Sequence, residues 1–324
     1  MSKIIKSMLV GSLLFTGAMA KDSNSTTIKK EAIVASQSDI QIFTSDNKDG
    51  KITAKTIEEV FKKAGFFVSA NRDMNIPFKK QFKESTFENY NLFTFYKKDT
   101  TLALAKKYDN IGLFAPMSMS IYTKKGSKNI SVSSLTASAM QKIMKIPTDE
   151  KLLTDLTTLV IKTLKIAMPN GKFETIPYKT EATPKELVTK FTMEIDPKDW
   201  EDELEELKMG FEGELAPNGF VIAGQNNLGD DFEEANYEGF DFYEVYSICK
   251  LPVIYTIAKS HPEAGAFAPC SLYLNKKKNA DTMTIAFPSV YNWISSMALK
   301  EKTDLSTLED AQKRMRKILK SLTE

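Results

Sequence analysis

The chain contains a single histidine, His261, among 324 residues. Zinc sites built on several histidines are therefore excluded, as is any His-x-x-x-His arrangement. A Ser-His-Asp triad would have to use His261, which lies in the segment "SHPEAG" after a predicted helix. We expect a solvent-exposed loop histidine there, and we keep His261 only as a weak ligand candidate.

Several other functional signatures are missing as well. Neither a Gly-x-Gly-x-x-Gly fingerprint nor a phosphate-binding loop occurs in the sequence. The net charge of +2 argues against a nucleic-acid-binding protein. No constellation of catalytic residues is recognisable, so we expect a protein that is not an enzyme, with an uncharacterised enzyme as an alternative.

Long apolar runs are also missing, apart from a short one at the N-terminus. Residues 1–20 open with Lys3 and Lys6, continue with an apolar core too short to span a bilayer, and close with Ala18-Met19-Ala20. This pattern predicts a secretory signal peptide that is cleaved after Ala20. We expect a periplasmic protein with no membrane span after cleavage.

Two further segments have a biased composition. Residues 21–38 are polar and are interpreted as a flexible leader, in which Asn24 lies in a short motif that resembles a bacterial glycosylation acceptor. Residues 191–244 contain 17 acidic residues against two lysines, so their local charge is −15. This acidic segment is interpreted as a solvated face that faces the basic first half, or alternatively as a docking surface for a cationic partner.

One phrase occurs twice in the sequence. "IGLFAPMSMSIY" at 111–122 matches "AGAFAPCSLYLN" at 264–275 at an offset of 153 residues, and the offset holds without a gap from residue 67 to about 124. A match of this length indicates a duplicated domain. The predicted organisation is a signal peptide (1–20), a leader (21–38), a first repeat domain (39–167), a connector (168–190) and a second repeat domain (191–324).

The two repeats have the same order of predicted elements. Alternating apolar residues predict strands, and apolar residues at helical spacing predict helices between them. The helices are expected at 56–64, 99–108 with Asp99 as its cap, 147–166, from Trp200 through Phe211, 252–260 and 306–322. The predicted fold is α+β, with two similar domains, each a mainly antiparallel sheet covered by helices.

The second repeat resembles a known family. A strand that ends in Cys249, then Pro252 at the start of a helix, and "GAFAPCSLYL" with Pro269 and Cys270 are similar to the core of the domain-of-unknown-function family 302. The first repeat resembles it in a degenerate form, because Tyr96, Asp99 and Met117 replace Cys249, Pro252 and Cys270.

The resemblance implies a compact α+β domain that often associates in pairs, and it implies no reaction. Two fused copies would form a pseudo-dimer within one chain, with the repeats packed on each other across an apolar interface. Since only the second copy keeps both cysteines, we expect it to carry whatever activity exists.

The sequence has only two cysteines, Cys249 and Cys270, in a chain expected to be exported. A disulfide between them is the first hypothesis, and it requires that their strands be antiparallel neighbours. The alternatives are buried thiols or a soft-metal site, in which His261 and Met117 are weak candidate ligands. No cofactor is expected if the cysteines form a disulfide, whereas a soft-metal site would bind copper or haem.

These observations predict an exported binding or interaction protein of the cell envelope, whose partner is a protein or a small molecule. A redox or soft-metal-binding periplasmic protein that uses Cys249 and Cys270 is the alternative, and an uncharacterised enzyme is the third.

Overall fold

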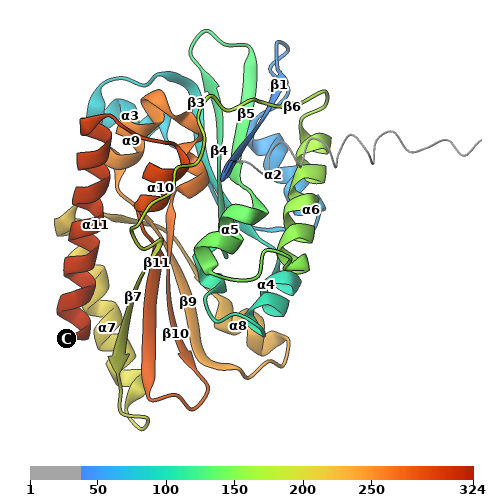
Figure 1. Cartoon of the computed structure of the whole chain (residues 1–324). Coiled ribbons are helices and arrows are strands. Elements are labelled where there is room, and N and C mark those ends of the chain that lie inside the picture. The colour runs from blue at the N-terminus through green and yellow to red at the C-terminus, as the bar shows by residue number, and fades with distance from the viewer. Residues whose placement is uncertain (1–37) are drawn as a thin grey trace, which may run out of the picture. The chain divides into compact units, whose positions relative to one another are not determined.

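The computed structural model describes residues 38–324. The predicted signal peptide, Asn24 and all of the predicted leader except Ser38 lie outside the described residues. Element labels follow Figure 1.

The first copy is built on a six-stranded antiparallel sheet in the order β2-β3-β4-β5-β1-β6. Its strands are β1 (Ile40–Asp46), β2 (Phe67–Asp73), β3 (Phe87–Tyr96), β4 (Met117–Lys124), β5 (Asn129–Leu135) and β6 (Lys172–Phe173). Its helices are α2 (Ala54–Lys63), α3 (Asn75–Phe82), α4 (Lys98–Ala105), α5 (Ala137–Met144) and α6 (Lys151–Ala167), with a 3-10 turn η1 (Ile111–Leu113).

The second copy has a five-stranded antiparallel sheet in the order β7-β11-β10-β9-β8. Its strands are β7 (Val188–Glu194), β8 (Val221–Asn227), β9 (Phe240–Cys249), β10 (Cys270–Lys277) and β11 (Thr282–Pro288). Its helices are α7 (Trp200–Leu215), α8 (Leu228–Glu234), α9 (Leu251–Ser260), α10 (Tyr291–Ser296) and α11 (Lys302–Thr323), with 3-10 turns η2 (Ala216–Asn218) and η3 (Pro262–Phe267).

The two sheets have the same topology, because β2-β3-β4-β5-β1 corresponds to β8-β9-β10-β11-β7. Strands β3, β4 and β5 begin and end 153 residues before β9, β10 and β11. The offset read from the sequence therefore extends to the end of β5, and the predicted α+β duplication is confirmed.

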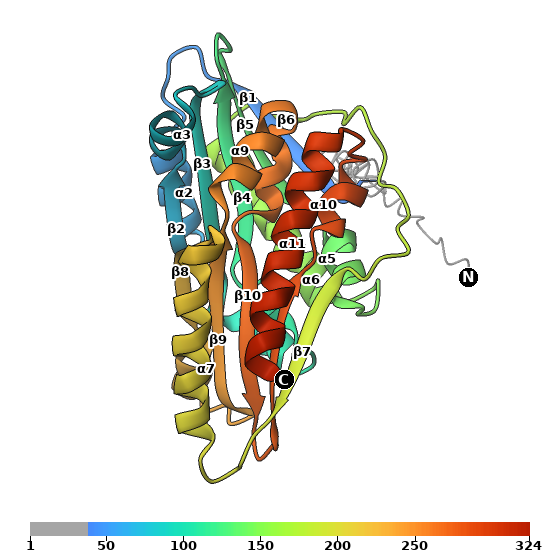
Figure 2. The ribbon, with the colours of Figure 1, turned by 90° about the vertical axis from the view of Figure 1, so that its left-hand side faces the viewer.

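Helices cover the outer face of each sheet. Figures 1 and 2 show α7 and α11 beside each other on the sheet of the second copy, while α2 and α6 lie on the far side of the strands. The α7 helix buries Leu204, Leu207 and Phe211 of the apolar stripe predicted for it, together with Leu215, while Trp200 at its start is only half-buried. Its remaining face is rich in glutamate and is exposed to solvent.

Some predicted helix limits were wrong. Asp99 lies within the first turn of α4 and does not cap it, since the N-cap is Lys97. The helix expected at 147–166 begins at Lys151, and a separate helix, α5, precedes it. The last helix begins at Lys302, four residues before the predicted start. Strand β7 begins at Val188, inside the predicted connector.

Reciprocal hydrogen bonds join the two copies. The Ser118 hydroxyl donates to the carbonyl oxygen of Pro269 at 3.0 Å, and the Ser271 hydroxyl donates to that of Pro116 at 3.1 Å. These donors are 153 residues apart, as are the acceptors, so the two bonds are equivalent under a pseudo-two-fold relation. This is the arrangement expected of an isologous dimer interface.

A second reciprocal pair lies deeper in the interface. The Tyr90 hydroxyl donates to the Pro262 carbonyl at 2.9 Å, and the Tyr243 hydroxyl donates to the Asp109 carbonyl at 2.8 Å. Both tyrosines are completely buried. The interface, which we expected to be apolar, thus also contains hydroxyl-to-carbonyl hydrogen bonds, because inward-facing strand positions hold Ser and Tyr.

The repeated phrase contributes a glycine to the interface in each copy. A Cβ atom on Gly112 would lie 2.6 Å from the Cβ of Tyr273, and one on Gly265 would lie 2.4 Å from the Cβ of Ser120. Gly112 and Gly265 are equivalent, and so are Ser120 and Tyr273. The phrase occurs twice because each copy uses it to approach a strand of the other at close range.

Within residues 38–324, none of the helices combines the length and the apolar character that a bilayer crossing requires.

Part of the acidic segment does meet the first copy, as the first interpretation expected. Lys98 of α4 forms ion pairs with Asp231 at 2.5 Å and Glu234 at 3.4 Å, both on α8.

Candidate functional site

A groove of about 880 Å³ lies between the two copies. The first copy contributes residues of β2, α3 and β3, while the second contributes η2, β8 and the junction between β9 and α9. The volume is within the range of small-molecule sites, which often form where two domains meet. The groove is therefore the strongest candidate site in the described part of the chain.

One wall of the groove carries a positive charge without an ionic partner. Arg72 of β2 is exposed, and its Nε donates to the carbonyl oxygen of Ala223 at 3.0 Å. No carboxylate within residues 38–324 forms an ion pair with it. Lys250, the other cation of the groove, is already bound to Asp310 at 3.1 Å and to the Asn218 carbonyl. Arg72 is thus the cation available to a ligand.

The floor of the groove contains an unsatisfied hydroxyl. Thr94 of β3 is 1% exposed, and its Oγ1 has no hydrogen-bond partner in the described part of the chain. Buried polar groups are hydrogen-bonded in the great majority of cases, so this hydroxyl, one of five such side-chain atoms in the described residues, has an unused hydrogen bond. A ligand that reaches the floor could provide the partner.

Apolar side chains form much of the rim. Ile76 of α3 is 70% exposed, and Val221 and Ile222 of β8 are 55% and 39% exposed. Isolated exposed apolar residues are common, but three around one groove indicate a binding surface.

The equivalent place on the other side of the pseudo-two-fold relation is occupied. Tyr96 stands there in place of Cys249, and its hydroxyl donates to Asp231 at 2.7 Å. Burial raises the pKa of Tyr96, and the hydrogen bond to Asp231 raises it further, so the hydroxyl stays a donor. On this side, the bulkier tyrosine and the ion pairs of Lys98 bridge the two copies. On the other side, the groove separates them.

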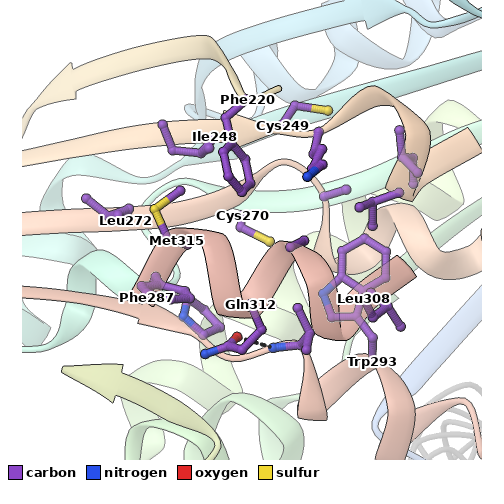
Figure 3. Close-up of a pocket in the computed structure, with 17 residues that line it drawn as sticks. Phe220, Ile248, Cys249, Cys270, Leu272, Phe287, Trp293, Leu308, Gln312 and Met315 are labelled. Carbon is purple, nitrogen blue, oxygen red and sulfur yellow. Dashed lines mark hydrogen bonds between the residues drawn. The ribbon is translucent and has the colours of Figure 1, made fainter. Parts of the chain in front are cut away.

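An apolar pocket of about 60 Å³ adjoins the groove within the second copy (Figure 3). It lies between the sheet and helices α9, α10 and α11, and its lining includes Cys270, Leu272, Phe287, Trp293 and Met315. The pocket and the groove share Phe220, Cys249 and Lys250, so these residues lie at the place where the two hollows meet.

The two cysteines are neighbours but are not bonded to each other. Strands β9 and β10 are antiparallel, as the disulfide hypothesis required, yet Cys270 lies opposite Ile248. Successive strand residues point to opposite faces, so Cys249 and Cys270 lie on opposite faces of the sheet. Figure 3 shows the Cys249 sulfur directed away from Cys270, and both cysteines are free thiols in the structure.

The environment of both thiols disfavours the thiolate. Burial raises the pKa of Cys249 to about 12, with a smaller contribution from Cys270. Burial also raises the pKa of Cys270 to about 12, against a hydrogen bond with Trp293 that lowers it. Reactive and metal-binding cysteines need a lowered thiol pKa.

The remaining candidate ligands do not converge on the cysteines. Met117 packs in the helix-covered core of the first copy, opposite Phe95 on β3, and is 3% exposed. Among the described residues, no group of three or more His, Cys, Asp or Glu side chains is arranged to hold a metal ion.

His261 is not the exposed loop residue we expected. Its Nδ1 lies 3.1 Å from the Glu263 carboxylate, which also accepts a hydrogen bond from the Tyr178 hydroxyl at 2.7 Å. Burial acts to raise the pKa of Glu263, but the bonds from His261 and Tyr178 outweigh it and hold the pKa below its usual value of 4.5. This cluster fixes the connector to η3.

Of the groove residues, Cys249 was singled out from the sequence, whereas Arg72 and Thr94 were not, and Cys270 lines only the adjoining pocket. A signal for Arg72 was present, because it is one of three arginines in a lysine-rich chain and the only one before residue 314. Thr94 carried no signal, since its importance arises from an unpaired hydroxyl that only the assembled fold reveals.

The model of the family described as "Domain of unknown function DUF302" matches the chain twice, at residues 42–165 and 198–322. A solved structure, an uncharacterized conserved DUF302 protein from Bacillus stearothermophilus, is 16% identical, and the match covers 43% of this chain and all of that chain with a TM-score of 0.35. No curated protein matches the sequence.

Proposed function

Because the chain belongs to the DUF302 family of domains and carries two copies of that domain, we propose that it is a binding protein that holds a small molecule in the groove between the copies. The observation that carries the proposal is the pairing of an unpaired cation, Arg72, with an unsatisfied buried hydroxyl, Thr94, in one groove. Arg72 lacks an ionic partner and Thr94 lacks a hydrogen-bond partner, and an anionic ligand would supply both.

We place this protein in the cell envelope, because residues 1–20 have the charge, apolar core and small-residue end of a signal peptide. Export is tested by the N-terminus of the protein recovered from the periplasm. The expected first residue is Lys21. Recovery of the unprocessed chain from the cytoplasm alone would contradict the localisation.

The sulfur-based alternative has less support. Both thiols have raised pKa values and lie on opposite faces of a sheet. A redox or soft-metal role would need thiolates that converge. The groove therefore remains the better basis for a function.

The test is native mass spectrometry of the mature chain after incubation with a small-molecule extract of the periplasm. The expected result is a chain that retains one low-mass ligand. Ile222→Trp fills the groove from its rim and should reduce ligand occupancy by about tenfold or more, since a tenfold loss needs only about 1.4 kcal/mol of lost contact.

Ile166→Trp is the matched control, because Ile166 is 69% exposed on α6 and does not line the groove. It should bind as the unmodified chain does. Equal occupancy in Ile222→Trp and Ile166→Trp, or no ligand on the unmodified chain, would overturn the proposed site.

A further inference from the structure

The apolar pocket of the second copy has the character of a ligand compartment. Its walls are aliphatic and aromatic, and the one amide in it, Gln312, is engaged with the Val290 backbone N–H and the Thr189 hydroxyl. Apolar cavities of proteins stay free of water and take up apolar groups. Gln312 therefore has hydrogen-bond partners, and Lys250, the other polar side chain of the lining, is held by Asp310, so the pocket favours an apolar group.

The first copy fills the equivalent space with its own side chains. Phe95 replaces Ile248, and Met117 and Met119 replace Cys270 and Leu272. Phe95 packs edge-on against Phe61 at 4.9 Å between ring centres, and both methionines are buried. The pocket therefore results from smaller residues at positions where the duplicated domain otherwise packs tightly.

The groove beside the pocket has a different character. Its lining includes the exposed Arg72, whose guanidinium forms no ion pair in the described part of the chain, and the buried Thr94, whose hydroxyl has no hydrogen-bond partner there. A guanidinium next to a hydroxyl suits a carboxylate or a phosphate, because both are planar or multidentate acceptors. The groove and the pocket share three lining residues, Phe220, Cys249 and Lys250.

We propose that the two hollows form one site for an amphipathic anion, whose head group binds at Arg72 and Thr94 and whose short apolar tail passes Phe220 into the pocket. This inference rests on the proposed function, because it assigns a ligand class to the same groove. The small size of the pocket limits the tail that it can enclose.

Fluorescence of Trp293 reports on tail entry. The chain has two tryptophans, so Trp200→Phe leaves Trp293 as the only one, and Trp293 lines the pocket. The probes are butanoate, hexanoate and octanoate, with 1-octanol as the uncharged control, all below their micelle concentrations. The expected result is a saturable change in Trp293 emission and a gain in affinity of about fourfold for each methylene until the pocket is full.

Two variants separate the head from the tail. Arg72→Gln should weaken octanoate binding by about tenfold or more, and Arg72→Lys should restore part of it. Cys270→Met introduces the residue of the first copy, and it should abolish the chain-length dependence. Leu274→Met is its control, because Leu274 is buried on the same strand but does not line the pocket.

If octanol binds as tightly as octanoate and Arg72→Gln has no effect, the proposal that an anionic head group binds at Arg72 is wrong. If Trp293 emission does not change, or if Cys270→Met and Leu274→Met have the same chain-length dependence of affinity, the proposal that the tail enters the pocket is wrong. If the periplasmic ligand binds in the groove but no carboxylate does, the ligand class is wrong while the binding function stands. If neither binds, both proposals fall.

Discussion

At the scale of single residues, the thiols illustrate how burial decides reactivity. Cys249 and Cys270 sit 21 positions apart on neighbouring strands, which made a disulfide a reasonable hypothesis. In the observed register Cys270 pairs with Ile248, one residue before Cys249. The side chains of Cys249 and Cys270 therefore point to opposite faces of the sheet. Sequence spacing could predict the adjacent strands, but it could not predict their register to one residue.

The thiols give the first prediction. With a pKa of about 12 in place of the ordinary 9.0, the thiolate fraction of Cys249 near pH 8 is smaller by about 1,000-fold. We expect two free thiols per chain in protein isolated without reductant, with labelling that is slow in the native state and fast after unfolding. An absence of free thiols would restore the disulfide hypothesis.

The buried carboxylate of Glu263 gives the second prediction. Tyr178→Phe removes one of its hydrogen bonds and should lower the free energy of unfolding by about 1–3 kcal/mol at pH 7. Since the pKa of Glu263 is lowered in the folded state, its stabilising contribution is present above pH 4.5 and is lost as the pH falls further. The effect of Tyr178→Phe should therefore shrink in acid.

Tyr291→Phe is the control for this measurement. The Tyr291 ring packs against Lys185, and its hydroxyl has no hydrogen bond within the described residues. Urea unfolding at pH 7 and at pH 3.5 would compare the two variants. Equal stability losses for both, or a Tyr178→Phe effect that grows in acid, would contradict the role given to Glu263.

At the scale of elements, long and strongly patterned segments were predictable, whereas short ones were not. The α7 helix was found from its apolar stripe, and the strands were found from alternation and from the offset of 153 residues. Helices α3, α5, α8 and α10 were missed, because six to eight residues contain few turns and give a weak periodic signal, and α4 is the one helix of that length in the described residues that was predicted. The groove depends partly on α3, so its wall could not be anticipated.

The close approach of η3 to β4 gives the third prediction. Gly265→Ala would bring a Cβ to 2.4 Å from Ser120, so the backbone of one copy must shift away from the other. We expect a loss of about 1–3 kcal/mol or more in the free energy of unfolding, as overpacking of a core causes.

Gly213→Ala provides the matched control for that loss. Gly213 lies inside α7, and no atom lies within 4 Å of a Cβ placed there. The substitution should stabilise the chain by about 0.5–1 kcal/mol, because alanine is the better helix former. Equal effects of Gly265→Ala and Gly213→Ala in urea unfolding would show that the contact between η3 and β4 is unimportant.

At the scale of the whole molecule, the two copies depend on each other. Each supplies carbonyl acceptors for hydroxyls of the other, so separation would leave Tyr90 and Tyr243 with unpaired hydroxyls on an exposed face. We expect a chain cut at a protease site inserted near Thr183, in the exposed segment before β7, to elute as one particle of the mass of the uncut chain. Fragments that elute separately would contradict the pseudo-dimer.

The two sides of the pseudo-two-fold relation also differ in whether a groove separates the copies. Tyr96 and Asp231 close one side, while Cys249 leaves the groove open on the other. We therefore expect one ligand per chain in native mass spectrometry, although the chain contains two copies of the domain. Two equivalent ligands per chain would show that the Tyr96 side also opens.

The exchange of Tyr96 for Cys249 has a consequence for inheritance. In a dimer of identical chains, one codon specifies both sides, so any mutation that opens a site on one side opens it on the other. Fusion of the copies into one chain gives each side its own codon. A mutation at position 249 can then change what is bound, while position 96 preserves the bridge to Asp231 that helps to hold the pair together. Gene duplication with fusion thus allows the two sides of the pair to change independently.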